Sequence, residues 1–291
     1  MTAKHCWLIG GTSDSAAIAR QLSALAIPYI VTVTTPSARK LYPTNAQIWV
    51  GKLSPLLAQD FVRRYHVECI ADASHPFASE ISKCAIALSQ KHSLPYLRYE
   101  RPTLTNTPSS NQNSSTIVCE KPTITTVDSI DSLADSALLK NQRVLFTIGY
   151  RHLEKFKNLR LTAKLYARIL PSPEAIAGAL SAGFGAKEIV ALRPPISLDL
   201  EIALWKQWNI SCVVAKASGQ LVTPAAHSSQ KTRAQKADLY SRESVSGESV
   251  KKQAALALGA HLILIDRPTV IYPHKTENLE EIIVFCQKHF T

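Results

Sequence analysis

The chain has 291 residues, of which 46% are hydrophobic and 19% are charged. It is therefore long enough for two globular domains, each with a core that needs no disulfide or metal ion to hold it together. The net charge of +11, from 33 Lys and Arg against 22 Asp and Glu, suits a polyanionic partner such as phosphates, a polycarboxylate or a nucleic acid. The basic residues are dispersed, however, with no dense run interleaved with aromatic residues, which disfavours a nucleic-acid interface.

Cysteine spacing and hydropathy predict a cytoplasmic protein with no membrane partner. No two cysteines are close enough for a CxxC motif, so we expect buried free thiols in a reducing compartment and no metal centre. The amino terminus enters a strand without an apolar signal core, and no apolar run approaches the roughly 20 residues that span a bilayer. The cysteines are Cys6, Cys69, Cys84, Cys119, Cys212 and Cys286.

The first hundred residues alternate between short β-like runs and helical segments. This alternation predicts the α/β class, with a mostly parallel sheet covered by helices on both faces, a Rossmann-like three-layer domain. We assign residues 1–102 to it. Strands are predicted at 5–10, 29–35, 67–73 and 94–102, and helices at 14–25, 56–65 and 77–92.

The second half repeats the alternation after a polar connector at 103–116. It predicts a second Rossmann-like domain over 117–291. A polar, basic stretch at 220–246 buries little apolar surface and is predicted to be a mobile insertion. Strands are predicted at 143–149, 162–170, 188–194, 210–218 and 261–268, and helices at 172–183, 250–259 and 278–289.

The segment "LIGGTSDSAAIA", at 8–19, joins the first strand to the first helix. Gly10 and Gly11 permit a close approach of the backbone to a phosphate, with the positive end of the helix behind them. The alternative is a tight turn in which Ser13 or Asp14 caps the helix. These residues alone leave both interpretations open.

The segment "FTIGYRHL", at 146–153, repeats that layout in the second half. Thr147 ends a strand, Gly149 permits a close approach, and Arg151 supplies a positive charge. Either one turn holds a cofactor while the other holds a substrate, or both line a shared cleft.

The segment "DASHPFA", at 72–78, follows an apolar strand at the place where open α/β sheets bind ligands. His75 is its only side chain that ordinarily titrates near neutral pH. Ser74 or Asp72 is a candidate cap for a helix that begins near Phe77. The segment is either a capped turn or the edge of an active site.

Basic residues close several predicted strands. Arg101 and Arg267 are each either a bidentate clamp for a carboxylate or one half of an ordinary surface ion pair. Together the basic residues stand at strand ends, where a polyanion can be held. They are Arg101 in "YERP", Arg168 in "ARILP", Lys216 in "AKASG" and Arg267 in "DRP".

These landmarks, in this order, resemble the precorrin-6A reductase family of cobalamin biosynthesis, including its cobalt-precorrin branch. The resemblance spans nearly the whole chain, and its most specific element is "DASHPFA" followed about twenty residues later by "PYLRYERP". One departure is Pro194-Pro195-Ile196, which stands where the family usually has Gly-Pro-Phe. The matching segments are "GGTSDS", "DASHPFA", "YLRYERP", "ARILPSP", "KASG" and "LILIDRP".

The resemblance implies an NADPH-dependent reductase that converts precorrin-6A or its cobalt complex to the corresponding precorrin-6B. Hydride goes to a ring carbon of the contracted tetrapyrrole, and a proton goes to the neighbouring carbon. It also implies two Rossmann-like domains with a cleft between them. The substrate carries several carboxylate arms, which gives the positive charge a partner. We expect a monomer or a small homo-oligomer.

The residues and the resemblance together assign three roles. His75 is the candidate catalytic residue, as proton donor, and water or the tetrapyrrole itself is the alternative donor. The cofactor-binding candidates are Gly10, Gly11, Thr12, Ser13, Thr34, Thr35, Arg39, Thr147, Gly149 and Arg151. The substrate-binding candidates are Ser74, His75, Phe77, Arg101, Arg168, Lys216, Ser218, Gly219 and Arg267.

Two rival functions belong to other classes. One is a non-catalytic protein of the same pathway that binds a tetrapyrrole or a nucleotide, and the other is a methyltransferase acting on the same type of ring, for which no comparable motif is present. Binding and consumption of NADPH separate the reductase from both.

Overall fold

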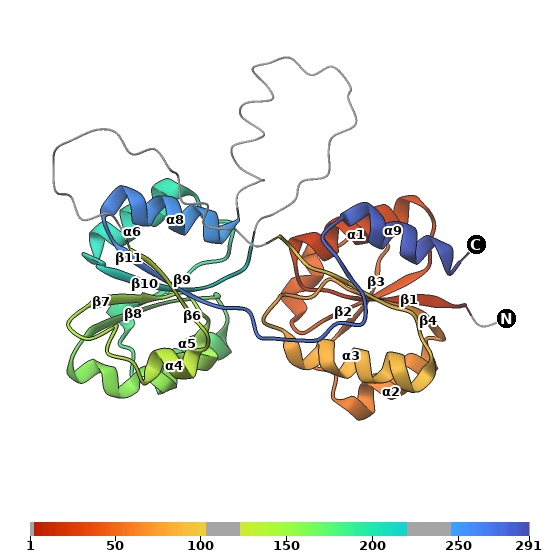
Figure 1. Ribbon diagram of the computed structural model, residues 1–291, viewed down its shortest axis with the longest axis horizontal. Coiled ribbons are helices and arrows are strands. Elements are labelled where there is room, and N and C mark those ends of the chain that lie inside the picture. Colours follow the sequence, from red (N-terminus) through yellow and green to blue (C-terminus); the bar gives the residue numbers. More distant parts are fainter. Residues whose placement is uncertain (1–2, 103–122, 220–245, 291) are drawn as a thin grey trace, which may run out of the picture. The chain divides into compact units, whose positions relative to one another are not determined.

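The computed structural model describes residues 3–102, 123–219 and 246–290, which form two compact units. Unit 1 comprises 3–102 and 268–290, and unit 2 comprises 123–219 and 246–267. Each unit contains one six-stranded, all-parallel sheet with helices on both faces (Figure 1). This confirms the predicted α/β class with two parallel-sheet domains. The cleft between the domains stays a prediction.

In unit 1 the strand order is β3-β2-β1-β4-β5-β12. Helices α1 and α9 cover one face of this sheet, and α2 and α3 cover the other (Figure 1). The strands are β1 (His5–Ile9), β2 (Tyr29–Val33), β3 (Gln47–Val50), β4 (Val67–Asp72), β5 (Tyr96–Tyr99) and β12 (Lys275–Thr276). The helices are α1 (Ser13–Ala24), α2 (Pro55–Arg64), α3 (Ser79–His92), α9 (Leu279–Lys288) and the 3-10 helix η1 (Pro36–Leu41).

Alternation along β1 explains why this sheet is buried on both faces. Cys6 and Leu8 enter the apolar cluster beneath α1 and α9, whereas Trp7 and Ile9 enter the cluster beneath α2 and α3. All four side chains are at most 2% exposed. A central strand of a parallel sheet needs such a continuous apolar run, because helices cover it above and below.

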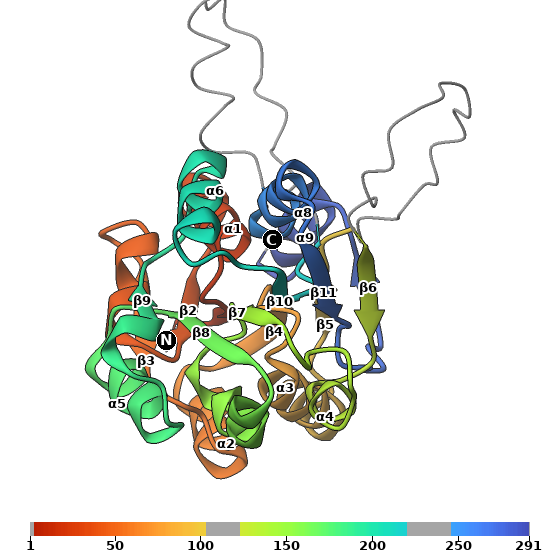
Figure 2. The ribbon, with the colours of Figure 1, turned by 90° about the vertical axis from the view of Figure 1, so that its left-hand side faces the viewer.

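In unit 2 the strand order is β9-β8-β7-β10-β11-β6 (Figure 2). Helices α6 and α8 lie on one face of the sheet, and α4, α5 and η2 lie on the other. The strands are β6 (Ile124–Val127), β7 (Arg143–Phe146), β8 (Lys164–Ile169), β9 (Ile189–Ala191), β10 (Cys212–Lys216) and β11 (His261–Ile265). The helices are α4 (Ile130–Ala134), α5 (Pro173–Ser181), α6 (Leu198–Gln207), α8 (Gly247–Leu258), η2 (Tyr150–Leu161) and η3 (Ala186–Glu188).

Strand β12, at the edge of the first sheet, corrects the end of the predicted second domain, 117–291. Strand β12 pairs in parallel with β5, and α9 packs on α1, so residues 268–290 belong to unit 1. Strand β6 follows unit 1 along the chain but pairs with β11 of unit 2. The two-residue strand β12 carries no periodicity, so only its pairing partner could place it.

Several short elements were not predicted, and two predicted segments cannot be compared. Strands β3, β6 and β12 have four residues or fewer, too short for a clear period. The α-helices α4 and α6 and the 3-10 helices η1, η2 and η3 were not predicted either. The connector at 103–116 and the insertion up to residue 245 lie outside the described residues.

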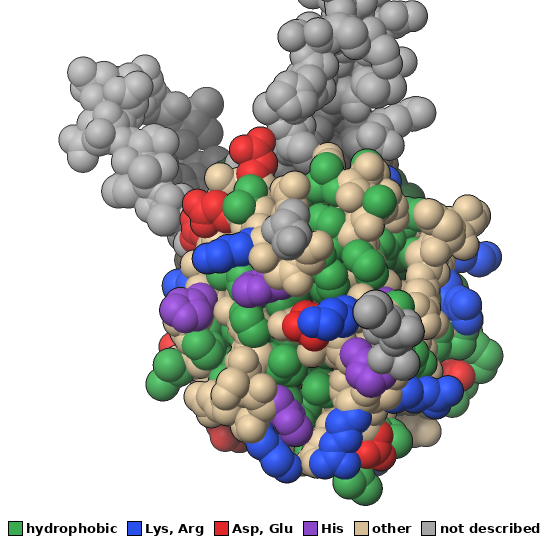
Figure 3. All heavy atoms as spheres, turned by 90° about the vertical axis from the view of Figure 1, so that its right-hand side faces the viewer, with side chains coloured by type: hydrophobic (Ala, Val, Ile, Leu, Met, Phe, Trp, Pro, Cys, Tyr) green, Lys and Arg blue, Asp and Glu red, His purple; other side chains and the backbone are tan. Residues whose placement is uncertain are grey.

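The sequence predicts a surface with dispersed basic residues, and buried free cysteines. On the face of unit 1 drawn in Figure 3, basic side chains are interspersed with acidic and apolar ones, as predicted. Cys6, Cys69, Cys212 and Cys286 are buried free thiols, whereas Cys84 is half-buried. Among the residues that the structure describes, no helix has the length and apolar character that crossing a membrane requires.

We predict that Ile282→Ala, at the buried face of α9, destabilises unit 1. Ile282 is 0% exposed within the cluster beneath α1 and α9, so truncation leaves a cavity and should lower the free energy of unfolding by about 2–5 kcal/mol. Val284→Ala, at a site 62% exposed on the same helix, should change it by less than about 0.5 kcal/mol. Urea denaturation measures both. Equal effects of the two variants would contradict the packing of α9 on this sheet.

Candidate functional site

The carboxyl ends of β1 and β4 form the switch point of unit 1, where the chain reverses its direction of travel across the sheet. The strands are neighbours, and β2 continues on one side while β5 continues on the other. In such sheets ligands bind outside the carboxyl ends at this position. The hydroxyl of Thr12 donates to the carbonyl of Ala73 at 2.8 Å. "GGTS" and "DASHPFA" are therefore in direct contact.

The two positions of the first turn are glycine for different physical reasons. A Cβ at Gly10 would collide with the Tyr42 hydroxyl and lie 2.6 Å from Cγ1 of Val31. Gly11 has φ of +102°, a conformation that favours glycine, and a Cβ there would meet nothing within 4 Å. Its N–H donates to the Tyr42 hydroxyl at 2.6 Å. Gly10 thus makes room for Tyr42, and Gly11 leaves open space for a ligand.

Thr12 caps α1, which corrects the alternative that Ser13 or Asp14 does so. The Thr12 hydroxyl accepts from the Ser15 amide, and the Ser15 hydroxyl accepts from the Thr12 amide. The amides of Ser13 and Asp14 are in the first turn, where a helix supplies no internal acceptor. A phosphate is suited to this position because the positive end of the helix dipole favours an anion. The turn therefore fits a dinucleotide cofactor.

Arg101 lies at the first turn of α1, beside cofactor candidates rather than other substrate candidates. Its Nε donates to the carboxylate of Asp14, and its Nη2 donates to the Ser13 hydroxyl at 3.2 Å. The side chains of Arg101 and Asp14 are 11% and 8% exposed. The structure thus joins Arg101 to the glycine turn.

Thr34, Thr35 and Arg39 follow β2 at the same edge of the sheet and are exposed. The Thr35 hydroxyl is 3.3 Å from that of Ser37. In a Rossmann-like sheet the end of the second strand lies beside the adenosine half of a dinucleotide. Hydroxyls and a guanidinium at this position suit a phosphate on the ribose.

Asp72 is the centre of a buried polar network beneath the "DASHPFA" turn. It is 0% exposed, and its Oδ1 accepts from Arg98 at 2.8 Å and from the Ser74 amide at 3.0 Å. Its Oδ2 accepts from the hydroxyls of Ser82 at 2.6 Å and Tyr96 at 2.7 Å. Burial alone would raise the pKa of Asp72, but Arg98 and these donors outweigh it and hold the pKa below its ordinary value.

This network corrects the predicted capping role of Asp72 and Ser74. Helix α3 begins at Ser79, after Ala78, and no side chain caps it. The Ser74 hydroxyl instead accepts from Arg98 at 2.9 Å, and its side chain is buried. Ser74 therefore supports the turn from within, and its predicted contact with a substrate is not favoured by this position.

His75 and Phe77 are the members of the turn that reach the surface. His75 is exposed, and its Nδ1 accepts from the Phe77 amide at 3.2 Å. That bond places the proton of the neutral imidazole on Nε2. The two rings lie 5.9 Å apart between centroids. The turn thus presents an imidazole and a neighbouring aromatic ring outward.

Arg98 and Tyr42 are residues that sequence reasoning missed. Arg98 is 1% exposed, and its guanidinium lies 5.2 Å from the ring centroid of Tyr272. An arginine inside an apolar strand, next to a strand that ends in aspartate, is a signal that could have predicted the pair. Tyr42 gave no such signal, because its contacts with the glycine turn come from a distant segment.

In unit 2 the equivalent switch point lies between the carboxyl ends of β7 and β10. The Thr147 hydroxyl donates to the carbonyl of Val214 at 3.0 Å, which joins the two strand ends. Gly149 has φ of +86°, and a Cβ there would meet nothing within 4 Å. Gly219, with φ of +77°, donates its N–H to Glu248 at 2.8 Å.

Cations gather at this second switch point. Burial lowers the pKa of Lys216, and Arg151 lowers it further. The pKa of His152 is also lowered, first by burial and then by the charges of Lys216, Lys155 and Arg151. Asp131 acts in the opposite direction. Neighbouring positive charges that lower the pKa of Lys216 and His152 are suited to an anionic ligand, because the ligand relieves their repulsion.

The two remaining strand-end arginines differ from each other. Arg168 donates to Glu201 at 2.5 Å, and Glu201 also accepts from Trp205, so Arg168 is half of a buried ion pair and not an exposed clamp. Arg267 lies beside Ser218, where its Nε donates to the carbonyl of Ala217 at 3.2 Å. Arg267 thus joins Lys216 at the cationic edge, and Arg168 does not.

Lys251 is a buried cation that sequence reasoning also missed. Its Nζ donates to the carbonyl of Gly247 at 2.9 Å, and its side chain is 8% exposed. Burial and the neighbouring Arg168 lower the pKa of Lys251 to about 8, although Glu201 and Glu248 act to raise it. It supports the start of α8 behind Gly219.

Two hollows on unit 1 lie away from these edges. One, of about 270 Å³, is bordered by His5, Pro28 and Gln47 at the amino ends of the strands. The other, of about 420 Å³, lies between α3 and residues 269–271. Neither contains a predicted site residue, so the switch points and not the hollows define the candidate site.

Known proteins match this chain over nearly its whole length. The family model described as Precorrin-6x reductase CbiJ/CobK matches residues 5–237. The chain belongs to the precorrin-6x reductase family. It is 40% identical over 285 residues to a cobalt-precorrin-6A reductase from Synechocystis sp., covering 97% of this chain and 96% of that protein. A cobalt-precorrin-6A reductase from Priestia megaterium is 29% identical over 280 residues, covering 95% of each chain.

The fold of this precorrin-6x reductase also matches a solved structure. The structure of a CobK precorrin-6A reductase has a TM-score of 0.70, covering 99% of this chain and 97% of its own at 21% identity. The family model and the 40% identical relative confirm the family resemblance seen in the motifs. The protein is an oxidoreductase of cobalamin biosynthesis, and a reductase of this family uses a reduced nicotinamide cofactor.

We predict that Asp72 stabilises the reductase in a pH-dependent way. Because its pKa is lowered on folding, its contribution is complete above its ordinary value of 3.8 and is lost as the pH falls through the folded value. Asp72→Asn removes the hydrogen-bonded counter-charge of the buried Arg98 and leaves only Glu100, 3.9 Å from its Nη2, so it should cost about 3–5 kcal/mol at pH 7. This difference from the wild type should shrink below about pH 4.

Urea denaturation between pH 3 and pH 7 measures this difference. Asp60→Asn, at an exposed site on α2, is the matched control and should show no such loss. A destabilisation by Asp72→Asn that does not change with pH would contradict the charge pairing.

Proposed function

We propose that this protein reduces cobalt-precorrin-6A to cobalt-precorrin-6B with NADPH as hydride donor. The single observation that carries the proposal is the 40% identity, over nearly full length, to a relative named cobalt-precorrin-6A reductase. Two features of the fold support it. One switch point fits a dinucleotide, and the other gathers cations that suit the carboxylate arms of a tetrapyrrole.

Unit 1 holds NADPH in this proposal. The amides at the start of α1 bind the pyrophosphate, above the space that Gly11 leaves open. Arg101 joins them, because its guanidinium already lies against Ser13 in that turn. Thr34, Thr35 and Arg39 hold the adenosine end, and Arg39 selects its extra phosphate.

Unit 2 holds the carboxylate arms. Arg151 is close enough to Lys216 to lower its pKa, and Arg267, after the neighbouring strand β11, donates to the carbonyl of Ala217. This position favours a substrate role for Arg151, which the sequence had assigned to the cofactor with Thr147 and Gly149. A carboxylate between such cations gains charge-assisted hydrogen bonds and lowers their mutual repulsion.

His75 delivers the proton. Bound NADPH supplies the hydride, so the chain needs to orient two ligands and place one proton. The Phe77 amide holds Nδ1 as an acceptor, so the neutral ring carries its transferable proton on Nε2. The Asp72 network beneath the turn holds this orientation through Ser74.

We predict that the purified protein oxidises NADPH only when cobalt-precorrin-6A is present, and that it prefers NADPH to NADH. Arg39→Leu should raise KM for NADPH about tenfold, roughly 1.4 kcal/mol, and leave KM for NADH unchanged. Arg20→Leu, an exposed arginine of the same unit, is the control and should change neither constant.

The decrease of NADPH absorbance at 340 nm under anaerobic conditions measures these rates, with metal-free precorrin-6A assayed in parallel. NADPH binding without consumption with either substrate would favour the non-catalytic binding protein and sink the reductase proposal.

We predict that His75→Asn lowers kcat by about 100-fold or more, because the asparagine Oδ1 takes the place of Nδ1 and accepts from the Phe77 amide yet cannot deliver a proton. His75→Ala should have a loss of similar size, and His274→Ala, at an exposed histidine of unit 1, should have none. Single-turnover rates with saturating NADPH measure the step. Recovery of wild-type kcat in His75→Asn would show that the ring only positions the turn.

A further inference from the structure

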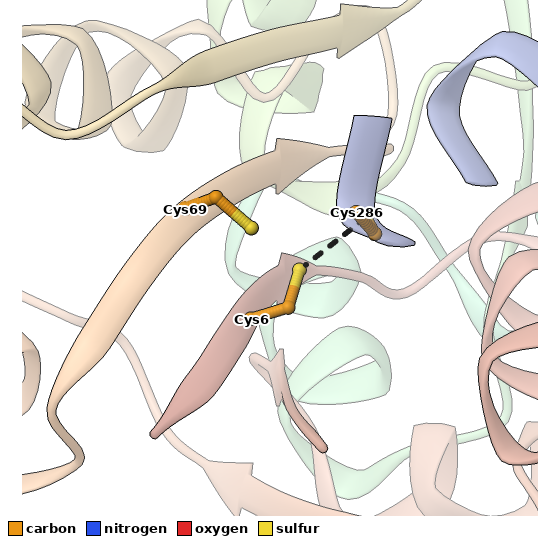
Figure 4. A group of neighbouring side chains, drawn as sticks. All are labelled: Cys6, Cys69 and Cys286. Atoms are coloured by element: carbon orange, nitrogen blue, oxygen red, sulfur yellow. Dashed lines mark hydrogen bonds between the residues drawn. The ribbon is translucent and has the colours of Figure 1, made fainter. Parts of the chain in front are cut away.

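Three cysteines from distant parts of the chain converge inside unit 1 (Figure 4). Cys6 on β1 and Cys69 on β4 are direct register partners, so their side chains point to the same face of the sheet. Cys286 reaches them from α9, which covers that face. The three sulfur atoms lie within 4.8 Å of one another, and Cys6 Sγ is 3.5 Å from Cys286 Sγ.

The sulfur separations suit a shared metal ion. Metal–thiolate bonds of about 2.3 Å place ligand sulfurs about 3.8 Å apart in a tetrahedral site and about 4.0 Å apart in a trigonal one. A disulfide would need two sulfurs at about 2.05 Å and would leave the third thiol unused. The observed 3.5 Å contact, with a third sulfur inside 4.8 Å, requires only small side-chain movements to surround one ion.

The surroundings of these thiols decide which metal fits. All three side chains are 0% exposed and belong to one apolar cluster with Leu8, Ala71 and others, which leaves no place for a water ligand. Within the described part of the chain, no fourth cysteine, histidine or carboxylate joins the group. Zinc sites in proteins are almost always four-coordinate, whereas three thiolates alone select a soft ion.

We propose that Cys6, Cys69 and Cys286 form a three-coordinate site for a soft thiophilic cation, with Cu(I) as the best fit. Each thiol that binds the metal loses its proton to solvent. The ion enters by local opening of α9, because the other two thiols lie on central strands beneath this ten-residue helix. Once bound, it links α9 to β1 and β4 and stabilises the folded state of unit 1.

Anaerobic titration of the reduced full-length protein with Cu(I) tests the site. The wild-type chain should keep about one Cu(I) against a chromogenic Cu(I) chelator, develop thiolate-to-Cu(I) absorbance in the ultraviolet, and unfold at a higher temperature. Cu-edge X-ray absorption of that complex should show three sulfur neighbours at about 2.3 Å.

Two matched sets of variants localise the ion. A chain with Cys84→Ser, Cys119→Ser and Cys212→Ala retains only the three converging thiols and should bind as the wild type does. Cys69→Ser and Cys286→Ser, each checked for folding by circular dichroism, should lose the retained Cu(I). Loss of binding in the first variant, undiminished binding in the others, or a wild-type complex with fewer than three sulfur neighbours would overturn the proposal.

Discussion

The ion pair between Asp72 and Arg98 constrains unit 1 more than any other single interaction described. Both side chains are at most 1% exposed, and withdrawing two charges from water is costly unless hydrogen bonds and a close counter-charge offset it. Donors from α3, β5 and the turn itself meet the carboxylate. Because these donors hold the end of β4 in one position, the turn that follows can present His75 outward.

The same network fastens the C-terminal segment to unit 1. Tyr272 lies beside the Arg98 guanidinium. Strand β12, which follows it along the chain, pairs with β5, the strand that carries Arg98. Strand β12 adds only two residues to the sheet, yet the segment also delivers α9 to the opposite face from α3. Side-chain contacts, and not strand length, therefore hold this segment in place.

The two switch points share a backbone plan but differ in electrostatics. In unit 1 the acids of the edge are paired, Asp72 with Arg98 and Asp14 with Arg101, around an open glycine turn. In unit 2 the cations crowd around Lys216, and the acid Glu248 is used to hold Gly219. Binding a dinucleotide requires free backbone amides and open space, which the glycine turn of unit 1 provides. Binding a polycarboxylate requires positive charge, which unit 2 provides.

Composition, alternation and motif order by themselves determined the α/β class, most of the central strands and helices, and the family. These features depend on local periodicity and on short runs of residues, which the sequence carries directly. Only the tertiary structure decided that Arg168 is buried against Glu201, that Tyr42 shapes the glycine turn, and that β12 completes the first sheet. The meeting of Cys6, Cys69 and Cys286 is of the same kind. Each depends on segments far apart in the chain, and the register between such segments is set by packing, which no local pattern records.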